Sequence, residues 1–135
     1  MIHKVFPDKQ KASSILEMAE DREKVISTLQ KSNFPTIITE NYYEIIKELA
    51  TALLLLDGLK TSGENAHKEV IDNLLNYKEF NDKDVILLND LRVKRNKSSY
   101  EGKKIENGYL EAREKFFAEI IDKMKFLINK RLGNV

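Results

Sequence analysis

The amino-acid sequence predicts an all-α fold, an up-and-down helical bundle of four long helices plus one short helix. The chain has only five glycines and two prolines in 135 residues, against an average usage of about 12% for the two together, which favours a few long elements. Its 41% of hydrophobic and 33% of charged residues suit amphipathic helices. Five segments repeat their apolar residues with the helical period.

The first two helices are expected over residues 8–31 and 36–60. In the first, an apolar stripe is interrupted by Arg22, whose long stem can lie along an apolar surface. Asn33 and Pro35 predict the end of this helix, because Asn suits a C-terminal cap and Pro cannot continue a helix. In the second, residues 49–56 are apolar almost all round, which is typical of the central helix of a bundle.

The three remaining helices are expected over residues 64–76, 82–99 and 107–130. Asn81 is a suitable N-cap for the fourth helix, and Gly102 is a suitable terminator. The connections are short, so helices that follow one another are expected to be antiparallel neighbours. The prediction is a single domain spanning residues 1–135, with its core at about residues 8–130.

Composition restricts the possible chemistry. The chain has no cysteine, which excludes disulfides, thiolate metal sites and a cysteine nucleophile. The longest apolar run, residues 49–56, is far shorter than the roughly 20 residues of a membrane span. The sequence lacks the paired Glu-x-x-His arrangement by which helical bundles bind two metal ions. We therefore expect a soluble, cytoplasmic protein that has no cofactor and no metal and does not bind a membrane.

One segment departs from the even charge balance. Residues 91–104 hold six basic residues and one acidic residue, although the net charge of the whole chain is only +1. The simplest interpretation is a solvated helix end, where cations interact favourably with the helix dipole. The alternative is a phosphate- or nucleic-acid-binding patch, whose candidate residues are Arg92, Lys94, Arg95, Lys97, Lys103 and Lys104.

Arg95 is the most informative residue of this segment. It continues the apolar stripe that Leu88 and Leu91 begin, so its guanidinium is expected to be half-desolvated at the mouth of the bundle. A guanidinium in that position can bind a phosphate through two parallel hydrogen bonds. The alternative is an internal ion pair with a Glu or Asp of the second or fifth helix.

The segment Arg95-Asn96-Lys97-Ser98-Ser99-Tyr100-Glu101-Gly102 resembles the signature of HEPN domains (higher eukaryotes and prokaryotes nucleotide-binding). That signature is an Arg, usually followed by a polar residue, with a His four to six residues further on. Residues 42–54 and 56–61 are similar to the family's central helix and its small-residue exit. The helix order also agrees, and the resemblance covers roughly residues 8–130.

The resemblance implies a helical bundle that forms a homodimer, with the motifs of two protomers facing one cleft. Many members of the family are metal-independent endoribonucleases, often toxins or defence proteins. Others are non-catalytic, and some pair with a small nucleotidyltransferase. In active members the Arg holds the scissile phosphate, the polar neighbour supports the site, and the His assists proton transfer.

Transferred to this sequence, the motif places Arg95, Asn96 and Tyr100 in the catalytic set, with Tyr100 where the family has its His. Tyr has a pKa of about 10 and is a poor general base at neutral pH. General acid–base catalysis is typically worth about 10²–10⁴ in rate. The resemblance therefore implies an RNA- or nucleotide-binding protein of a toxin–antitoxin or defence system, and the missing His predicts that its catalysis is weak or absent.

Two alternatives to this function remain open, besides a plain helical bundle with no ligand in this crevice. The first is a metal-independent endoribonuclease that acts through Tyr100, or through His67 brought in from elsewhere in the fold. His67 is expected on the surface of the short helix, with a place at the cleft rim as the alternative. The second is a non-catalytic partner subunit of a small nucleotidyltransferase.

Overall fold

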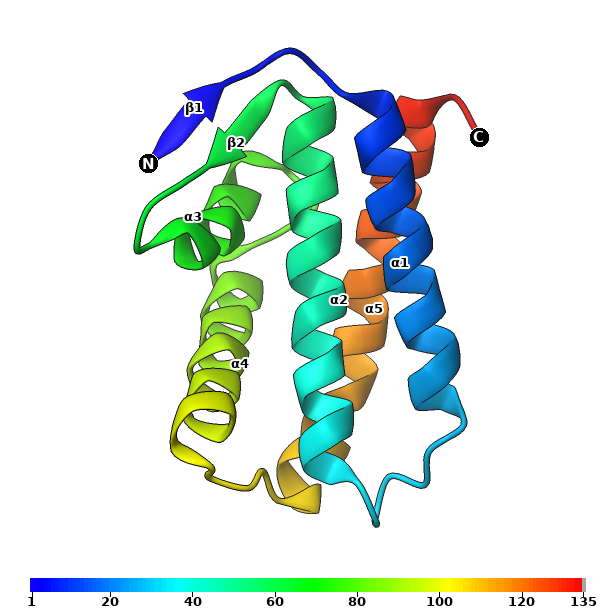
Figure 1. Ribbon diagram of the computed structural model, residues 1–135, viewed down its shortest axis with the longest axis vertical. Coiled ribbons are helices and arrows are strands. Elements are labelled where there is room, and N and C mark those ends of the chain that lie inside the picture. Colours follow the sequence, from blue (N-terminus) through cyan, green and yellow to red (C-terminus); the bar gives the residue numbers. More distant parts are fainter. Residues whose placement is uncertain (135) are drawn as a thin grey trace.

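The computed structural model describes residues 1–134 and confirms the all-α bundle (Figure 1). Four long helices and one short helix account for most of these residues. Two three-residue strands, one near the N-terminus and one just after the second long helix, pair with each other. The elements in chain order are β1 (Ile2–Lys4), α1 (Lys9–Ser27), α2 (Pro35–Leu56), β2 (Leu59–Thr61), α3 (Ala66–Asp72), the 3₁₀ turn η1 (Asn73–Asn76), α4 (Asp82–Glu101) and α5 (Asn107–Leu132).

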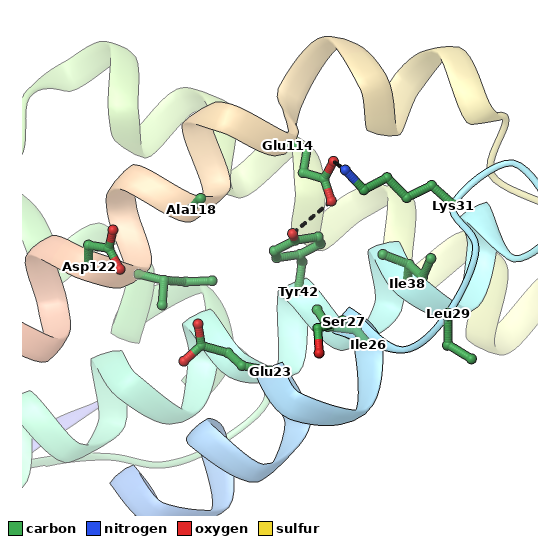
Figure 2. A pocket seen from close by; sticks show the side chains of 11 residues that line it. Glu23, Ile26, Ser27, Leu29, Lys31, Ile38, Tyr42, Glu114, Ala118 and Asp122 are labelled. Carbon is green, nitrogen blue, oxygen red and sulfur yellow. Dashed lines mark hydrogen bonds and ion pairs between the residues drawn. The ribbon is translucent and has the colours of Figure 1, made fainter.

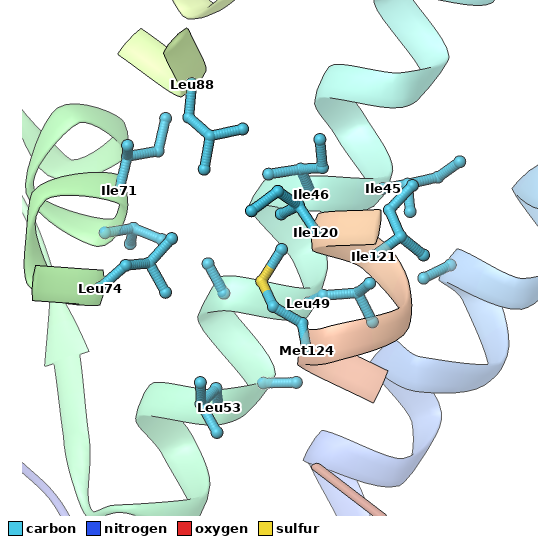
Figure 3. Close-up of a cluster of buried hydrophobic side chains, with 14 of the residues drawn as sticks. Ile45, Ile46, Leu49, Leu53, Ile71, Leu74, Leu88, Ile120, Ile121 and Met124 are labelled. Atoms are coloured by element: carbon cyan, nitrogen blue, oxygen red, sulfur yellow. The ribbon is translucent and has the colours of Figure 1, made fainter. Parts of the chain in front are cut away.

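The four long helices alternate in direction along the long axis of the molecule, as predicted (Figure 1). Helix α2 is central and packs against α1, α3, α4 and α5. Its residues from Ala52 to Leu55 are all buried, which explains why this segment is apolar almost all round. Figure 3 shows Leu49 and Leu53 of α2 among side chains of α3, η1, α4 and α5.

Several helix ends lie where the sequence predicts them. Pro35 is the first residue of α2. Asn81 caps α4, accepting a hydrogen bond from the backbone N–H of Asp84, whose carboxylate accepts one from the N–H of Asn81. Gly102 ends α4 with a φ of +69°, a left-handed conformation that favours glycine.

The end of α1 was predicted incorrectly. The helix ends at Ser27 rather than near residue 31, and Asn33 is not its cap. The hydroxyls of Ser27 and Thr28 donate to the carbonyl oxygens of Lys24 and Val25, each at 2.7 Å. These bonds satisfy carbonyl groups that another helical turn would have used, so the helix can end there.

The strands were not predicted. β1 and β2 form a two-stranded antiparallel sheet in which His3 pairs with Lys60. The pairing begins at Gly58, whose carbonyl oxygen accepts a hydrogen bond of 2.9 Å from the N–H of Val5. Gly58 has a φ of +74°, and a Cβ there would lie 3.0 Å from the carbonyl oxygen of Val5. The segment after β2 leads into α3, which packs against β2, α2 and α4.

Within residues 1–134, no helix combines the length and the apolar character needed to cross a membrane.

Candidate functional site

The polar half of α4 faces a row of glutamates on α2. The apolar stripe of α4 is buried at Leu88 and Leu91, and one turn further on it reaches Arg95 and then Ser98. The hydroxyl of Ser98 donates to Glu40 Oε2 at 2.7 Å. Arg95 Nη2 donates to Glu44 Oε1 at 2.6 Å. The polar residues that interrupt the stripe therefore have specific partners one turn apart on α2.

Arg95 forms the internal ion pair that the sequence left open as an alternative to phosphate binding. Its side chain is only 16% exposed, and a cation at such depth needs a counter-charge. Its Nη1 lies 3.4 Å from Asn96 Oδ1, and its guanidinium carbon lies 5.1 Å from the ring centre of Tyr43 and 5.8 Å from that of Tyr100. One edge of the guanidinium is thus engaged by Glu44.

Glu44 is shared between two cations. Lys47 Nζ donates to its Oε2 at 2.8 Å, while Arg95 occupies Oε1. Burial alone would raise the pKa of Glu44, but the hydrogen bond from Lys47 and the charges of Lys47 and Arg95 outweigh burial and lower it. Because one carboxylate serves two cations, this cluster keeps one unit of positive charge.

An open pocket of about 300 Å³ lies beside this cluster, between α4 and the segment that leads into α3. Arg92, Asn96 and Tyr100 line its α4 side. They are spaced by four residues and so form one row on the helix. The opposite wall consists of residues 63–68. The pocket therefore collects three of the residues that the sequence singled out.

Arg92 is the guanidinium of the pocket that lacks a carboxylate partner. Its Nε donates to Asn89 Oδ1 at 3.2 Å. Within residues 1–134 it forms no ion pair. Tyr100, at the other end of the row, is 76% exposed. The pocket thus offers an unpaired guanidinium at one end and an accessible aromatic ring at the other.

His67 lies on the α3 wall of this pocket and also lines an adjoining pocket of about 200 Å³ against α2. Partial burial of its ring lowers its pKa from 6.5, and the charges of Lys47 and Arg95 lower it further, although Glu44 opposes them. His67 is exposed, as the sequence predicts, and it occupies the rim of the cleft. It stands in a local positive field.

Tyr43 lies behind Arg95 and is completely buried. Its hydroxyl has no hydrogen-bond partner among residues 1–134. Burial raises the pKa of Tyr43 to about 12, although the charges of Arg95 and Arg92 act in the opposite direction. A buried hydroxyl without a partner costs free energy. The Tyr43 hydroxyl is therefore an unused hydrogen-bonding group on the residue that packs against Arg95.

The basic segment does not form one patch. Lys94 lies over the ring of Tyr109, with Nζ 5.4 Å from the ring centre, on the α5 side of α4. Lys97 and Lys103 are exposed and do not line the pocket. Lys104 lines a separate pocket, of about 560 Å³, at the end of the bundle. Successive residues of a helix are about 100° apart, so a run of charge along α4 is distributed around it.

Another cavity, of about 370 Å³, lies between α1, α2 and α5 (Figure 2). The hydroxyl of Tyr42 donates to Glu114 Oε2 at 2.8 Å, and Lys31 pairs with the same carboxylate. Burial and this hydrogen bond raise the pKa of Tyr42. Glu23 pairs with Lys125 at 2.9 Å. These acidic groups therefore already have internal partners that connect the three helices.

Among residues 1–134, no group of three or more His, Asp and Glu side chains is arranged to hold a metal ion. The fold and the site together define a helical bundle with a cationic, aromatic-edged pocket between α3 and α4. No protein-family model matches the sequence, and no curated protein is significantly similar to it.

The sequence did not indicate that residues 63–68 form the opposite wall of the site. The sequence left open a pair between Arg95 and a Glu or Asp of the second or fifth helix, but it did not identify Glu44 or indicate Glu40, although the two are one helical turn apart on the predicted second helix. That spacing was the available signal, because residues four apart lie on the same face.

Proposed function

We propose that this chain is a HEPN-like protein that binds RNA or a nucleotide in the pocket between α3 and α4, as part of a toxin–antitoxin or defence system. The observation that carries the binding proposal is the row Arg92, Asn96 and Tyr100, in which the guanidinium has no carboxylate partner. An Arg can hold a phosphate through two hydrogen bonds, and an exposed aromatic ring can stack on a base. The amide of Asn96 can hydrogen-bond a base edge.

In this proposal Arg92 contacts the ligand and Arg95 positions the pocket. Arg95 is held by Glu44, and its guanidinium lies within 5.8 Å of the Tyr100 ring centre. Arg95, which matches the Arg of the family signature, therefore contacts Asn96 and Tyr100 and holds these two pocket residues in position. Arg92, three residues before Arg95 on the helix, faces the open space of the pocket.

The test is binding of a short, fluorescently labelled single-stranded RNA, measured by anisotropy at constant salt. Arg92→Ala should weaken binding about tenfold or more, the loss expected for a hydrogen bond between charged groups. Lys94→Ala is the matched control, because it removes the same charge from the same helix on the α5 side. It should change affinity only about twofold, by reducing general attraction to phosphates.

Equal losses in the two variants would show that binding depends on overall charge and not on this pocket. Absence of binding to the unaltered protein would refute the proposed function.

A metal-independent endoribonuclease is the second candidate, and one observation favours it. His67 lines the same pocket as Arg92, so a group that can exchange a proton at neutral pH is present although Tyr100 replaces the motif His. Incubation of the protein with the RNA in the presence of a chelator tests for cleavage that does not need a metal ion. Cleavage that is lost in His67→Gln supports the enzyme, and binding without cleavage supports the non-catalytic protein.

We propose that the chain forms a homodimer through the outer face of α4. Ile86 and Val93 lie seven residues apart on this face and are 67% and 40% exposed. Large exposed apolar side chains that share one helix face are typical of a surface that associates. Sedimentation should give twice the 15.7 kDa mass of one chain. Ile86→Glu should give the single-chain mass, while Val25→Glu on α1 should leave the dimer intact.

A further inference from the structure

We propose that the pocket between α3 and α4 takes a phosphodiester of a single-stranded nucleic acid, and that His67 takes up a proton when this ligand binds. The proposal rests on the proposed function and adds the charge of the ligand and the pH dependence of its binding. It depends on residues 63–68, the wall of the pocket opposite α4, which includes His67.

The charges around the pocket match a ligand with few negative charges. Glu44 compensates only one of its two cations, Lys47 and Arg95. Lys68 and Asp72 neutralise each other at 2.5 Å. Arg92 adds one positive charge, and the carboxylate of Glu64, which also lines the pocket, removes one.

With His67 neutral, these groups leave one net positive charge, without Lys60, which lines the adjoining pocket. A phosphodiester carries a single negative charge and fits this balance, whereas a triphosphate needs several more cations. When His67 is protonated, the pocket gains a second positive charge on the wall opposite Arg92. The same phosphodiester is then held between charged groups of α3 and α4.

His67 is the group of this pocket whose ordinary titration falls between about pH 5 and pH 8. The charged and titratable groups around it come from every neighbouring element. They are Glu44 and Lys47 of α2, Arg92, Arg95 and Tyr100 of α4, Glu64, Lys68 and its partner Asp72 beside it, and Lys60 of β2. Carboxylates and Lys or Arg side chains keep their charge across this range.

The direction of the effect follows from the surroundings of His67. Its pKa lies below 6.5 because its ring is partly buried and because Lys47 and Arg95 repel a further positive charge. A bound anion reverses part of this repulsion and raises the pKa. By linkage, a ligand that favours the protonated form must bind more tightly as the pH falls.

The test uses a short, labelled 2′-O-methyl oligouridylate without terminal phosphates. Its phosphodiesters and bases keep the same charge between about pH 5.5 and pH 7.5 while His titrates, and without a 2′-hydroxyl it cannot be cleaved by internal attack. At constant ionic strength, the unaltered protein should bind it more tightly at the lower pH, by up to about tenfold, which is the limit for a rise of one pKa unit.

Three variants isolate the group responsible. His67→Gln should bind equally at both pH values. His67→Arg carries a permanent charge and should bind tightly at both. His3→Gln removes the only other histidine and should keep the pH dependence of the unaltered protein. In nuclear magnetic resonance titrations, the ring protons of His67 should show a higher pKa with the oligonucleotide than without it.

The outcomes separate this inference from the proposed function. Equal affinity of the unaltered protein at both pH values, or a pH dependence that persists in His67→Gln, would overturn the inference and leave RNA binding intact. Absence of binding at both pH values would overturn both the inference and the proposed function.

Discussion

Arg92 and Arg95 are three residues apart on α4, yet their surroundings give them different chemistry. Arg95 lies on the face of α4 that packs against α2. There Glu44 compensates its positive charge, with Arg95 Nη2 2.6 Å from Glu44 Oε1. Arg92 faces α3, and its Nε donates to an amide oxygen, that of Asn89. A guanidinium whose charge is already compensated gains less from a phosphate than one that is uncompensated. The residue that best matches the motif is therefore not the residue best placed to bind an anion.

The ion pair of Glu44 has a consequence for stability against acid. The pKa of Glu44 is lowered in the folded state, where Lys47 and Arg95 outweigh burial. A carboxylate with a depressed folded pKa stabilises the fold above its unfolded value, here near 4.5, and this stabilisation is lost as the pH falls through the folded pKa. Glu44→Gln should lower the free energy of unfolding at neutral pH by about 1–2 kcal/mol.

Urea denaturation at pH values above and below 4.5 measures this contribution. The difference between the unaltered protein and Glu44→Gln should shrink in acid, because protonation removes the same charge that the substitution removes. Glu101→Gln, at the exposed end of α4, is the control and should follow the unaltered protein at all pH values. A constant difference between Glu44→Gln and the unaltered protein would contradict the assignment.

At the scale of elements, the sequence predicted what local stereochemistry determines. Pro35, Asn81 and Gly102 mark helix ends through a fixed φ, a side-chain cap and a left-handed φ, and each is found at such an end. The end of α1 was missed because two hydroxyls, not a Gly or Pro, complete it. β1 and β2 were missed because three-residue strands carry no readable period and pair with a partner more than fifty residues away.

The candidate site divides in the same way. The α4 half was predictable, because Arg92, Asn96 and Tyr100 have helical spacing. Charge alone grouped Arg92 with Lys94, although a helix of this kind directs the two towards α3 and α5. The α3 half was not predictable, because the sequence does not show which loop packs opposite α4. His67 joins the site only through that tertiary contact.

For the whole molecule, α2 is the element on which both the core and the site depend. One hydrophobic cluster contains buried residues of all five helices and passes through α2 (Figure 3). The same helix carries Glu40 and Glu44, which hold the polar half of α4. The pocket therefore keeps its shape only while α2, α3 and α4 remain packed, so folding and ligand binding are expected to be lost together.

Leu49 tests this coupling, because it is fully buried in α2 among the other helices. Leu49→Ala should lower the free energy of unfolding by about 2–5 kcal/mol through lost burial and the cavity left behind. Met18→Ala on α1, where the side chain is 52% exposed, should change it by no more than about 0.5 kcal/mol.

Helix content and tyrosine fluorescence, followed in urea, should give coincident transitions for both variants, since a single cluster joins the five helices. Two separated transitions, with α3 and α4 unfolding before α1, α2 and α5, would contradict a single cooperative core. Such a result would also mean that the pocket can be lost while most of the bundle remains folded.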